Sequence, residues 1–215
     1  MSKKISFSEQ WAKNTYPFIA ILRGLTPEHS IPVCKGLIEL GIKYIEVPLN
    51  TDYAYDVIGS LINEFGDEAI IGAGTVLRID QVQKIKDIGG NIIISPNLNE
   101  EVIKLTKKLG MISCPGVYTV TEAFNAIEYG ADILKFYPAE MIPPKIFNAI
   151  LTVLPKDGLY FPVGGIGANS KQLNDYIHVG AKGFGIGGSL YNPNMSIDDV
   201  IDNAKNLIYA WNNRI

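Results

Sequence analysis

Histidine and cysteine are scarce in this sequence of 215 residues, which holds two of each. His29 and His178 fall in predicted helices, where surface positions are expected, so neither a catalytic triad nor a histidine-rich metal centre is indicated. Cys34 and Cys114 fall in apolar segments and are expected to be buried thiols of a reducing compartment rather than a disulfide framework. A reactive role for Cys114, at the end of a predicted strand, stays open. These absences leave no visible ligand set for a metal.

Excess positive charge and long apolar runs are also absent. The net charge of −3 and the scattered Lys and Arg residues argue against binding of nucleic-acid phosphates. No apolar stretch reaches the length of a membrane span, and no signal-peptide core follows Lys3 and Lys4. We therefore expect a soluble, cytoplasmic protein with neither nucleic-acid nor membrane partners. Its length and its hydrophobic content of 47% favour one domain over residues 1–215.

Short runs rich in Val, Ile, Ala and Gly alternate with longer amphipathic segments, which is the rhythm of βα units. Strands that are apolar on both faces indicate a parallel sheet covered by helices. Eight such units fit a closed (β/α)8 TIM barrel, an α/β fold that we predict with an N-terminal helix. The expected strands are Phe18 to Leu22, Tyr44 to Val47, Ala69 to Ala73, Asn91 to Ser95, Met111 to Cys114, Ile133 to Tyr137, Tyr160 to Val163 and Gly183 to Ile186.

A doubly wound sheet is the alternative fold, and it often carries a glycine-rich dinucleotide fingerprint. Residues 183–188 do match the spacing G-x-G-x-x-G. They form the last predicted strand, however, with no later strand to complete a βαβ unit and no acidic residue at its end. We therefore favour the barrel and do not predict a dinucleotide site.

Lys135 stands in the middle of an otherwise apolar predicted strand. Burial strips water from the ammonium group and favours the neutral amine, a nucleophile that can form a Schiff base with a carbonyl. Glu46, expected at the end of the second strand, is another isolated charge among apolar residues. The two could instead form a structural salt bridge, and from these residues alone both interpretations stay open.

Several polar residues are expected at the carboxyl ends of the strands, where barrels of this kind hold their functional side chains. Arg23 ends the first strand, Thr75 follows the third and Asn97 follows the fourth. Strand alternation places Tyr137 on the same face as Lys135, so both should line one cavity. Arg23 and Asn97 could instead be solvated loop residues, and Thr75 could cap the third helix. Their convergence on one rim favours a shared site.

Two glycine pairs follow the last two predicted strands. Gly164 and Gly165 come after the seventh strand, and Gly187 and Gly188 come after the eighth. Barrels bind phosphate at these two places through backbone N–H groups, and glycine lets the backbone approach the anion. The pairs could instead be tight turns. A phosphate site beside a nucleophilic lysine suggests a phosphorylated carbonyl substrate.

Four segments together resemble one known family. They are GAGTV at 72–76, LKFYPAE at 134–140, PVGGI at 162–166 and GGS at 187–189. Their residues and their order along nearly the whole chain resemble the class I 2-keto-3-deoxy-6-phosphogluconate (KDPG) aldolases. This resemblance implies a homotrimer of (β/α)8 barrels that needs neither metal nor organic cofactor.

The resemblance also implies roles for individual residues. Lys135 would be the Schiff-base lysine and Glu46 the general acid/base. Thr75 would contact the pyruvate moiety, and the phosphate would be held by Gly164, Gly165 and Ser189.

The branch of the family that acts on the C4 epimer, 2-dehydro-3-deoxy-6-phosphogalactonate (KDPGal), is the closer match. Asn50 stands where the gluconate enzymes have arginine, so Arg23 is expected to take over the substrate carboxylate. Val163 stands where they have a threonine that reads the C4 hydroxyl, and its loss should relax or invert the epimer preference. Ala139 and Glu140 instead resemble the gluconate branch.

The sequence thus predicts cleavage of the phosphorylated keto sugar acid KDPGal to pyruvate and glyceraldehyde 3-phosphate. Activity on KDPG or on 4-hydroxy-2-oxoglutarate is the alternative within the family. Two further alternatives share the barrel. One is a phosphosugar isomerase with Glu46 as base, and the other is a phosphosugar-binding protein without catalysis.

Overall fold

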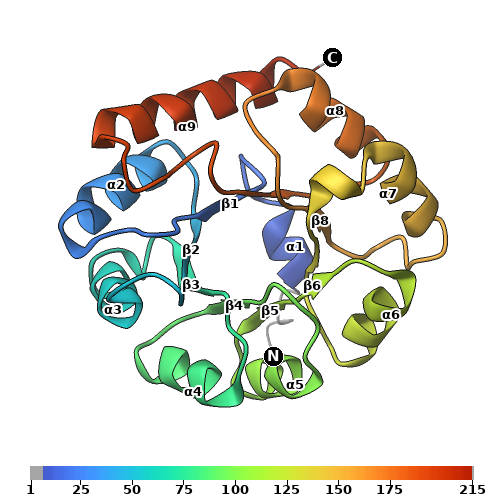
Figure 1. Cartoon of the computed structure of the whole chain (residues 1–215), viewed down its shortest axis with the longest axis horizontal. Coiled ribbons are helices and arrows are strands. Elements are labelled where there is room, and N and C mark those ends of the chain that lie inside the picture. The colour runs from blue at the N-terminus through green and yellow to red at the C-terminus, as the bar shows by residue number, and fades with distance from the viewer. Residues whose placement is uncertain (1–6, 215) are drawn as a thin grey trace, which may run out of the picture.

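Parallel strands alternate with helices throughout residues 7–214, which this computed structural model describes. Residues 1–6, with Lys3 and Lys4, and residue 215 lie outside the described residues. The strands curve around a common centre and the helices lie outside them, except the first helix, which lies across that centre in this view (Figure 1). The strands are β1 (Phe18–Ile21), β2 (Tyr44–Pro48), β3 (Ile70–Gly74), β4 (Ile92–Ile94), β5 (Ile112–Cys114), β6 (Gly116–Val117), β7 (Leu134–Phe136), β8 (Tyr160–Pro162) and β9 (Phe184–Ile186).

Helix α1 precedes the first strand, and the other helices follow strands along the chain, with none between β5 and β6. They are α1 (Phe7–Trp11), α2 (Pro27–Glu39), α3 (Ala54–Phe65), α4 (Ile79–Asp87), α5 (Glu100–Lys108), α6 (Val120–Glu128), the 3-10 turn η1 (Ala139–Met141), α7 (Pro144–Leu151), α8 (Ser170–His178) and α9 (Ile197–Asn212). Side-chain hydrogen bonds cap the amino ends of several helices. At α6, for example, Thr119 and Glu122 form a capping box. Between residues 7 and 214, no helix has both the length and the hydropathy of a membrane span.

Sheet pairing follows the chain order. One sheet has six strands in the order β5-β4-β3-β2-β1-β9, and a second has three in the order β6-β7-β8. Every pair of strands in the described part of the chain is parallel. A parallel bridge between Val163 and Gly185 connects the end of β8 to β9. The predicted α/β class with parallel strands is confirmed.

The fifth predicted strand differs from the structure. The sequence suggested one strand from Met111 to Cys114, but the chain continues past it into a second short strand, β6. Pro115 stands between β5 and β6 and has no N–H group with which to continue a ladder. Because β5 pairs with β4 while β6 pairs with β7, the chain changes sheets at this proline.

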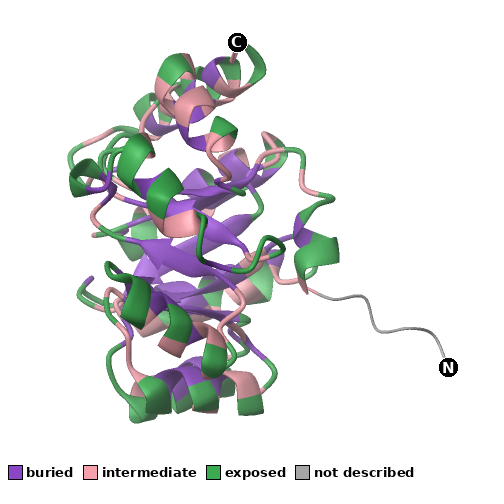
Figure 2. Ribbon diagram, turned by 90° about the vertical axis from the view of Figure 1, so that its right-hand side faces the viewer, coloured by how far each residue is buried: buried purple, intermediate pink, exposed green. Residues whose placement is uncertain are grey.

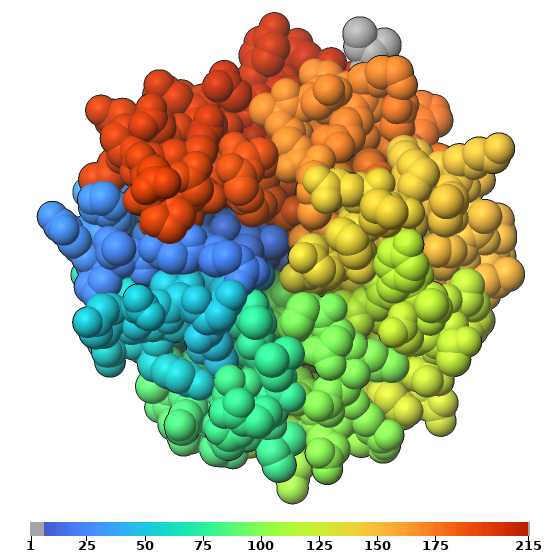
Figure 3. Space-filling model, in the orientation of Figure 1, coloured from blue at the N-terminus to red at the C-terminus, as the bar shows by residue number. Residues whose placement is uncertain are grey.

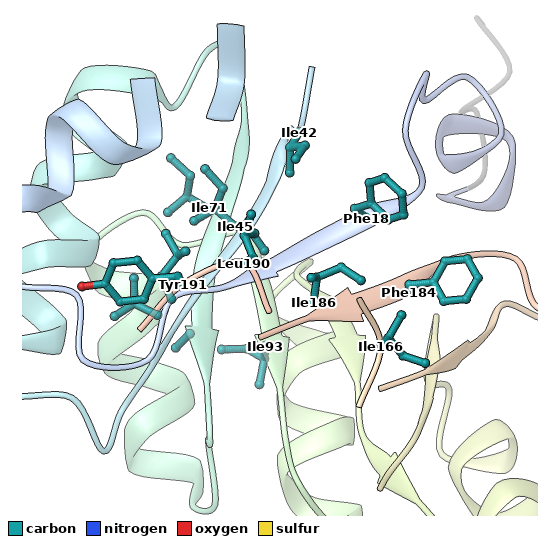
Figure 4. Close-up of a cluster of buried hydrophobic side chains, with 14 of the residues drawn as sticks. Phe18, Ile42, Ile45, Ile71, Ile93, Ile166, Phe184, Ile186, Leu190 and Tyr191 are labelled. Carbon is teal, nitrogen blue, oxygen red and sulfur yellow. The ribbon is translucent and has the colours of Figure 1, made fainter. Parts of the chain in front are cut away.

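Strand side chains alternate between two hydrophobic cores. In β1, Phe18 and Ala20 pack in the large core between the strands and the helices, whereas Ile19 and Ile21 belong to a smaller core inside the ring of strands. Figure 4 shows part of the large core, where Phe18 lies near Phe184 of the neighbouring strand, with ring centroids 6.2 Å apart. Figure 2 shows the strands largely buried and the outer faces of the helices exposed.

Helix α1 closes the inner core from one side. The Trp11 ring lies 4.6 Å from the Tyr44 ring and 4.8 Å from the Phe161 ring, measured between centroids. Its indole Nε1 donates a hydrogen bond of 2.8 Å to the carbonyl of Lys182. Tyr44 is the first residue of β2, so Trp11 covers the amino ends of the strands. The carboxyl ends remain for a functional site.

Gly183 and Gly185, the first two glycines of the segment 183–188, serve packing in this core. A Cβ atom on Gly183 would approach Phe161 to 2.6 Å and Trp11 to 2.7 Å, and one on Gly185 would approach Val163 to 2.8 Å. Only glycine fits these inward-facing positions. Two of the three glycines that match the dinucleotide fingerprint therefore have a steric explanation, whereas a Cβ atom on Gly188 would meet no neighbour within 4 Å.

Candidate active site

A cavity of about 710 Å³ opens at the carboxyl ends of the strands. Figure 3 shows blue, green, yellow and orange segments, far apart in the sequence, meeting around the centre of this face. Asn97, expected on the rim, is exposed and does not line the cavity, whereas its neighbour Pro96 does. Apart from Asn97 and Glu46, the predicted site residues line it, namely Arg23, Asn50, Thr75, Lys135, Tyr137, Val163, Gly164, Gly165, Gly187, Gly188 and Ser189.

Lys135 lies in the middle of β7 and is only 8% exposed. Its neighbours Leu134 and Phe136 pack in the large outer core, so strand alternation directs the lysine inward. The Lys135 Nζ atom lies 5.1 Å from the centroid of the Tyr137 ring, whose π face attracts a cation. The structure places both side chains in one cavity, as the alternation predicted.

Glu46 lies beneath the cavity and not on its rim. The sequence placed it at the end of a strand, but β2 continues to Pro48 and Leu49 still donates to the carbonyl of Gly74 on β3. Glu46 is therefore in the middle of the ladder. It faces a small inner cavity of about 10 Å³ that Lys135 also lines. Lys135 lines both this inner cavity and the open one.

Burial dominates the electrostatics of Glu46. The residue is 1% exposed, and this desolvation raises its pKa to about 7, although the positive charges of Lys135 and Arg23 oppose the shift. Within residues 7–214, its Oε2 atom has no hydrogen-bond partner. A Cβ atom on Gly74 would lie 1.5 Å from that oxygen, so glycine is required there. A carboxyl group that ionises near neutrality is suited to moving protons.

The salt bridge considered from the sequence is not formed. Among the described residues, Lys135 and Glu46 do not form an ion pair, which requires a nitrogen–oxygen distance of 4.0 Å or less. Their charges still interact, because Lys135 holds the pKa of Glu46 below the value that burial alone would give. The amine is left facing the cavity.

Arg23 and Asn50 come from neighbouring strands and meet at the mouth. Arg23 follows β1 and Asn50 follows β2, and the guanidinium Nη1 donates a hydrogen bond to the Asn50 Oδ1 atom. The amide of Gly24 also donates to the Thr51 hydroxyl at 2.8 Å, which ties the two loops together. These bonds hold Arg23 while leaving further N–H donors for a carboxylate.

Thr75 has a strained backbone. Its φ of 54° lies in the left-handed region, which a β-branched residue rarely adopts, and strain of this kind gathers at functional sites. Helix α4 begins with Arg78 in the N-cap position, so Thr75 is not the cap considered from the sequence. Its side chain lines the cavity together with Lys135.

The loop after β8 presents free backbone amides. Gly164 and Gly165 have φ values of 100° and 69°, which favour glycine. In the part of the chain that the structure describes, the amides of Gly165 and Ile166 donate to no protein group. Successive free amides in such a loop form an anion-binding concavity.

The loop after β9 is arranged in a similar way. The amides of Leu190 and Tyr191 both donate to the carbonyl of Gly187, which makes residues 187–191 a tight turn. Among the described residues, the amides of Gly188 and Ser189 have no acceptor. The Ser189 hydroxyl donates to the carbonyl of Ile166 at 2.7 Å, so it joins this loop to the one after β8. Together the two loops suit a phosphate group.

Comparison with known proteins identifies the family. A protein-family model for KDPG and KHG aldolase matches residues 11–205. The chain belongs to this family. The 2-dehydro-3-deoxy-6-phosphogalactonate aldolase of Escherichia coli (strain K12) is 37% identical over 202 residues, which cover 94% of this chain and 97% of that protein.

Solved structures of related aldolases have the same fold. A native KDPGal structure has a TM-score of 0.89 and 36% sequence identity, and the match covers 93% of this chain and 96% of that one. A KDPG aldolase from Legionella pneumophila, with pyruvate captured as a covalent carbinolamine, has a TM-score of 0.79 and 26% identity over 95% of this chain and 98% of that one. The family resemblance inferred from the sequence is confirmed.

Sequence reasoning missed some residues that line the cavity of this aldolase. Glu140 lies in η1, four residues after the end of the lysine strand and within the segment 134–140, so its position in that motif was a usable signal. Tyr191, Asn192 and Pro193 come from the long loop between β9 and α9. The Tyr191 hydroxyl donates to the carbonyl of Gly24 at 3.3 Å, a contact between opposite ends of the chain. No local pattern predicts such a contact.

The cysteines and histidines of the aldolase lie apart from the large cavity. Cys34 and Cys114 are buried free thiols, as predicted. Cys114 lines the small inner cavity, where burial raises its pKa to about 12 and keeps the thiol protonated. His29 and His178 are not among the lining residues. In residues 7–214, no group of three or more His, Cys, Asp or Glu side chains is placed to hold a metal ion.

Proposed function

We propose that this aldolase cleaves 2-dehydro-3-deoxy-6-phosphogalactonate into pyruvate and glyceraldehyde 3-phosphate through an imine at Lys135. The observation that carries the proposal is one amine, buried in a cavity, with a carboxyl group beneath it and two amide-lined loops at the mouth. The similarity to the Escherichia coli galactonate enzyme supports the substrate. The carbinolamine in the Legionella relative supports the chemistry.

The amine of Lys135 begins the reaction. Its nitrogen attacks the C2 ketone, and the resulting carbinolamine loses its hydroxyl as water to give a protonated imine. The C3–C4 bond then breaks, its electron pair moves into an enamine, and C4 leaves as the aldehyde carbon. Protonation at C3 and hydrolysis of the imine release pyruvate and restore the free amine.

Glu46 moves the protons of this sequence. It supplies the proton with which the carbinolamine hydroxyl leaves, and as a carboxylate it takes the proton of the C4 hydroxyl during cleavage, directly or through a water molecule. A pKa near 7 allows both roles at neutral pH. Metal independence is part of the proposal, and unchanged turnover after treatment with EDTA would test it.

The two ends of the substrate are held apart. Arg23, braced by Asn50, faces the carboxylate together with Thr75, and the two glycine loops take the phosphate. Tyr137 packs between the amine and Gly164, because a Cβ atom on that glycine would lie 3.4 Å from its ring. Fixing both ends places C2 beside Lys135 and lowers the entropic cost of reaction.

The substrate epimer is tested by comparing kcat/KM for KDPGal and KDPG. A higher value for KDPGal supports the proposal, whereas a higher value for KDPG assigns the chain to the gluconate enzymes. If neither compound is cleaved but an isomerised product forms, the aldolase mechanism is wrong.

Val163 is expected to influence this ratio. It lines both cavities and is 5% exposed, so a hydroxyl introduced there would face the substrate and not solvent. Val163→Thr should shift kcat/KM toward KDPG several-fold, the effect of about one hydrogen bond. Val163→Ala is the control, because it changes volume without adding a hydroxyl. An equal shift in both variants would attribute the effect to volume.

Replacing Ser189 is expected to weaken binding of the substrate phosphate and to leave the chemistry at C2 unchanged. Its hydroxyl bonds the carbonyl of Ile166, so Ser189→Ala loosens the contact between the two glycine loops. KM for the phosphorylated substrate should rise several-fold, while cleavage of an unphosphorylated analogue stays nearly unchanged. Thr152→Ala removes a similar hydroxyl-to-carbonyl bond on the exposed end of α7 and serves as the control. Equal losses on both substrates would move the phosphate site elsewhere.

The finer architecture also belongs to this proposal. We interpret β5 and β6 as one strand interrupted at Pro115, which makes the two sheets a single (β/α)8 barrel with α1 as its N-terminal helix. The family match over residues 11–205 supports one domain. A homotrimer is what the family resemblance implies, and analytical ultracentrifugation would test it. The cytoplasm is the compartment expected from the free cysteines.

A further inference from the structure

We propose that Gln172 is a positioning residue that orients the phosphate-binding loop after β8. This inference rests on the proposed function and assigns a role to a side chain outside the cavity lining. Gln172 lies in the first turn of α8, on the far side of the loop, where it lines a separate surface pocket with Ala139 and Glu140. It cannot touch a substrate in the main cavity and acts only through the loop.

The side chain of Gln172 holds the loop by two bonds of opposite polarity. Its Nε2 donates to the carbonyl of Gly165 at 2.8 Å, and its Oε1 accepts from the amide of Gly167 at 3.1 Å. The backbone N–H group of Gln172 donates to the Asn169 side-chain oxygen at 2.9 Å, which fixes the start of α8. The planar side-chain amide of Gln172 therefore sets the orientation of two peptide units, the one after Gly165 and the one before Gly167.

Three consecutive carbonyls of the loop are held in this way. The carbonyl of Gly165 accepts from Gln172, that of Ile166 from the Ser189 hydroxyl, and that of Gly167 from the Asn169 amide at 2.8 Å. The carbonyl of Gly165 and the amide of Ile166 belong to one planar peptide unit, so anchoring that carbonyl directs the Ile166 N–H group the opposite way. Within the described chain, the amide of Ile166 has no protein acceptor. The loop is thereby kept with this donor available for an anion.

The glycines make this anchoring necessary. Gly164 and Gly165 have positive φ values, and glycine backbones reorient more readily than those of other residues. A carbonyl turned toward the cavity would repel a phosphate instead of binding it. Gln172 removes that freedom before the substrate arrives, so the loop is already in its binding conformation.

Two variants separate the bonds that Gln172 makes. Gln172→Glu keeps an acceptor for Gly167 but loses the donor to Gly165, and Gln172→Met loses both while keeping the side-chain length. Gln83→Met is the matched control, since Gln83 is an exposed helical glutamine that donates to Asp87 at 2.8 Å. Each variant is assayed for KM with phosphorylated and unphosphorylated substrates and for trapping of pyruvate by borohydride.

Gln172→Met should raise KM for the phosphorylated substrate about tenfold, the scale of one to two lost hydrogen bonds, and Gln172→Glu should raise it at least as much. Turnover of the unphosphorylated analogue and trapping of pyruvate should match the wild type and Gln83→Met. A residue that merely stabilised the fold would lower both activities together. An unchanged KM, or equal losses on both substrates, overturns the inference.

A second readout is independent of the proposed reaction. Binding of inorganic phosphate, followed by calorimetry, should weaken about tenfold in Gln172→Met and stay unchanged in Gln83→Met. If the wild type binds phosphate but cleaves no phosphorylated keto acid, the proposed function fails while the role of Gln172 is still decided by this measurement. Equal phosphate affinity in the wild type and Gln172→Met rejects the role.

Discussion

Lys135→Met is expected to lower kcat by more than about 10³-fold, because it removes the amine that forms the imine and leaves only binding and proton transfer. Methionine has a similar length and no charge, so it suits a position that is 8% exposed. Losing the lysine charge should also raise the pKa of Glu46 further, since that charge now opposes the effect of burial. Steady-state kinetics with the phosphorylated substrate measure the loss.

The control for this variant is Lys43→Met. Lys43 is exposed and immediately precedes β2, at the amino ends of the strands. It should keep wild-type activity. Turnover by Lys135→Met within about tenfold of the wild type would show that another group provides the nucleophile.

Glu46→Gln is expected to lower kcat by about 10²-fold or more, the usual effect of removing a general acid/base. The amide preserves the size of the side chain beside Gly74 but cannot accept or release a proton under these conditions. Imine formation with pyruvate should still be detectable by trapping, because the amine of Lys135 is intact. Retention of the wild-type kcat would leave Glu46 with a structural role only.

The pH dependence gives a second test of Glu46. Its pKa is raised to about 7, and it accepts a proton only when it is ionised. For the wild type, kcat/KM should therefore decrease as the pH falls below about 7. In Glu46→Gln this acidic limb should be absent. An identical limb in both proteins would assign the ionisation to a different group.

Much of the site could be predicted because its residues carry local signals. Lys135 and Glu46 are charges in apolar strands, and the two glycine pairs follow predicted strands directly. Strand periodicity then directs Lys135 and Tyr137 to the same side. The α/β class follows from the same alternation of strands and helices.

Other features depend on tertiary contacts and could not be predicted. The depth of Glu46 follows from how far β2 pairs with β3, and strand ends are poorly marked in a sequence. The approach of Tyr191 to Gly24 joins residues near opposite ends of the chain. The hydrogen bond from Gln172 to the carbonyl of Gly165 depends on the side-chain conformation. In the sequence, Gln172 looks like any glutamine in the first turn of a helix.

Trapping with pyruvate and borohydride, followed by mass analysis of the peptides, tests the covalent mechanism most directly. We predict a reduced pyruvate adduct on Lys135 in the wild type and in Glu46→Gln, and no adduct in Lys135→Met. An adduct on another lysine, or none in a preparation that cleaves the substrate, would contradict the imine at Lys135.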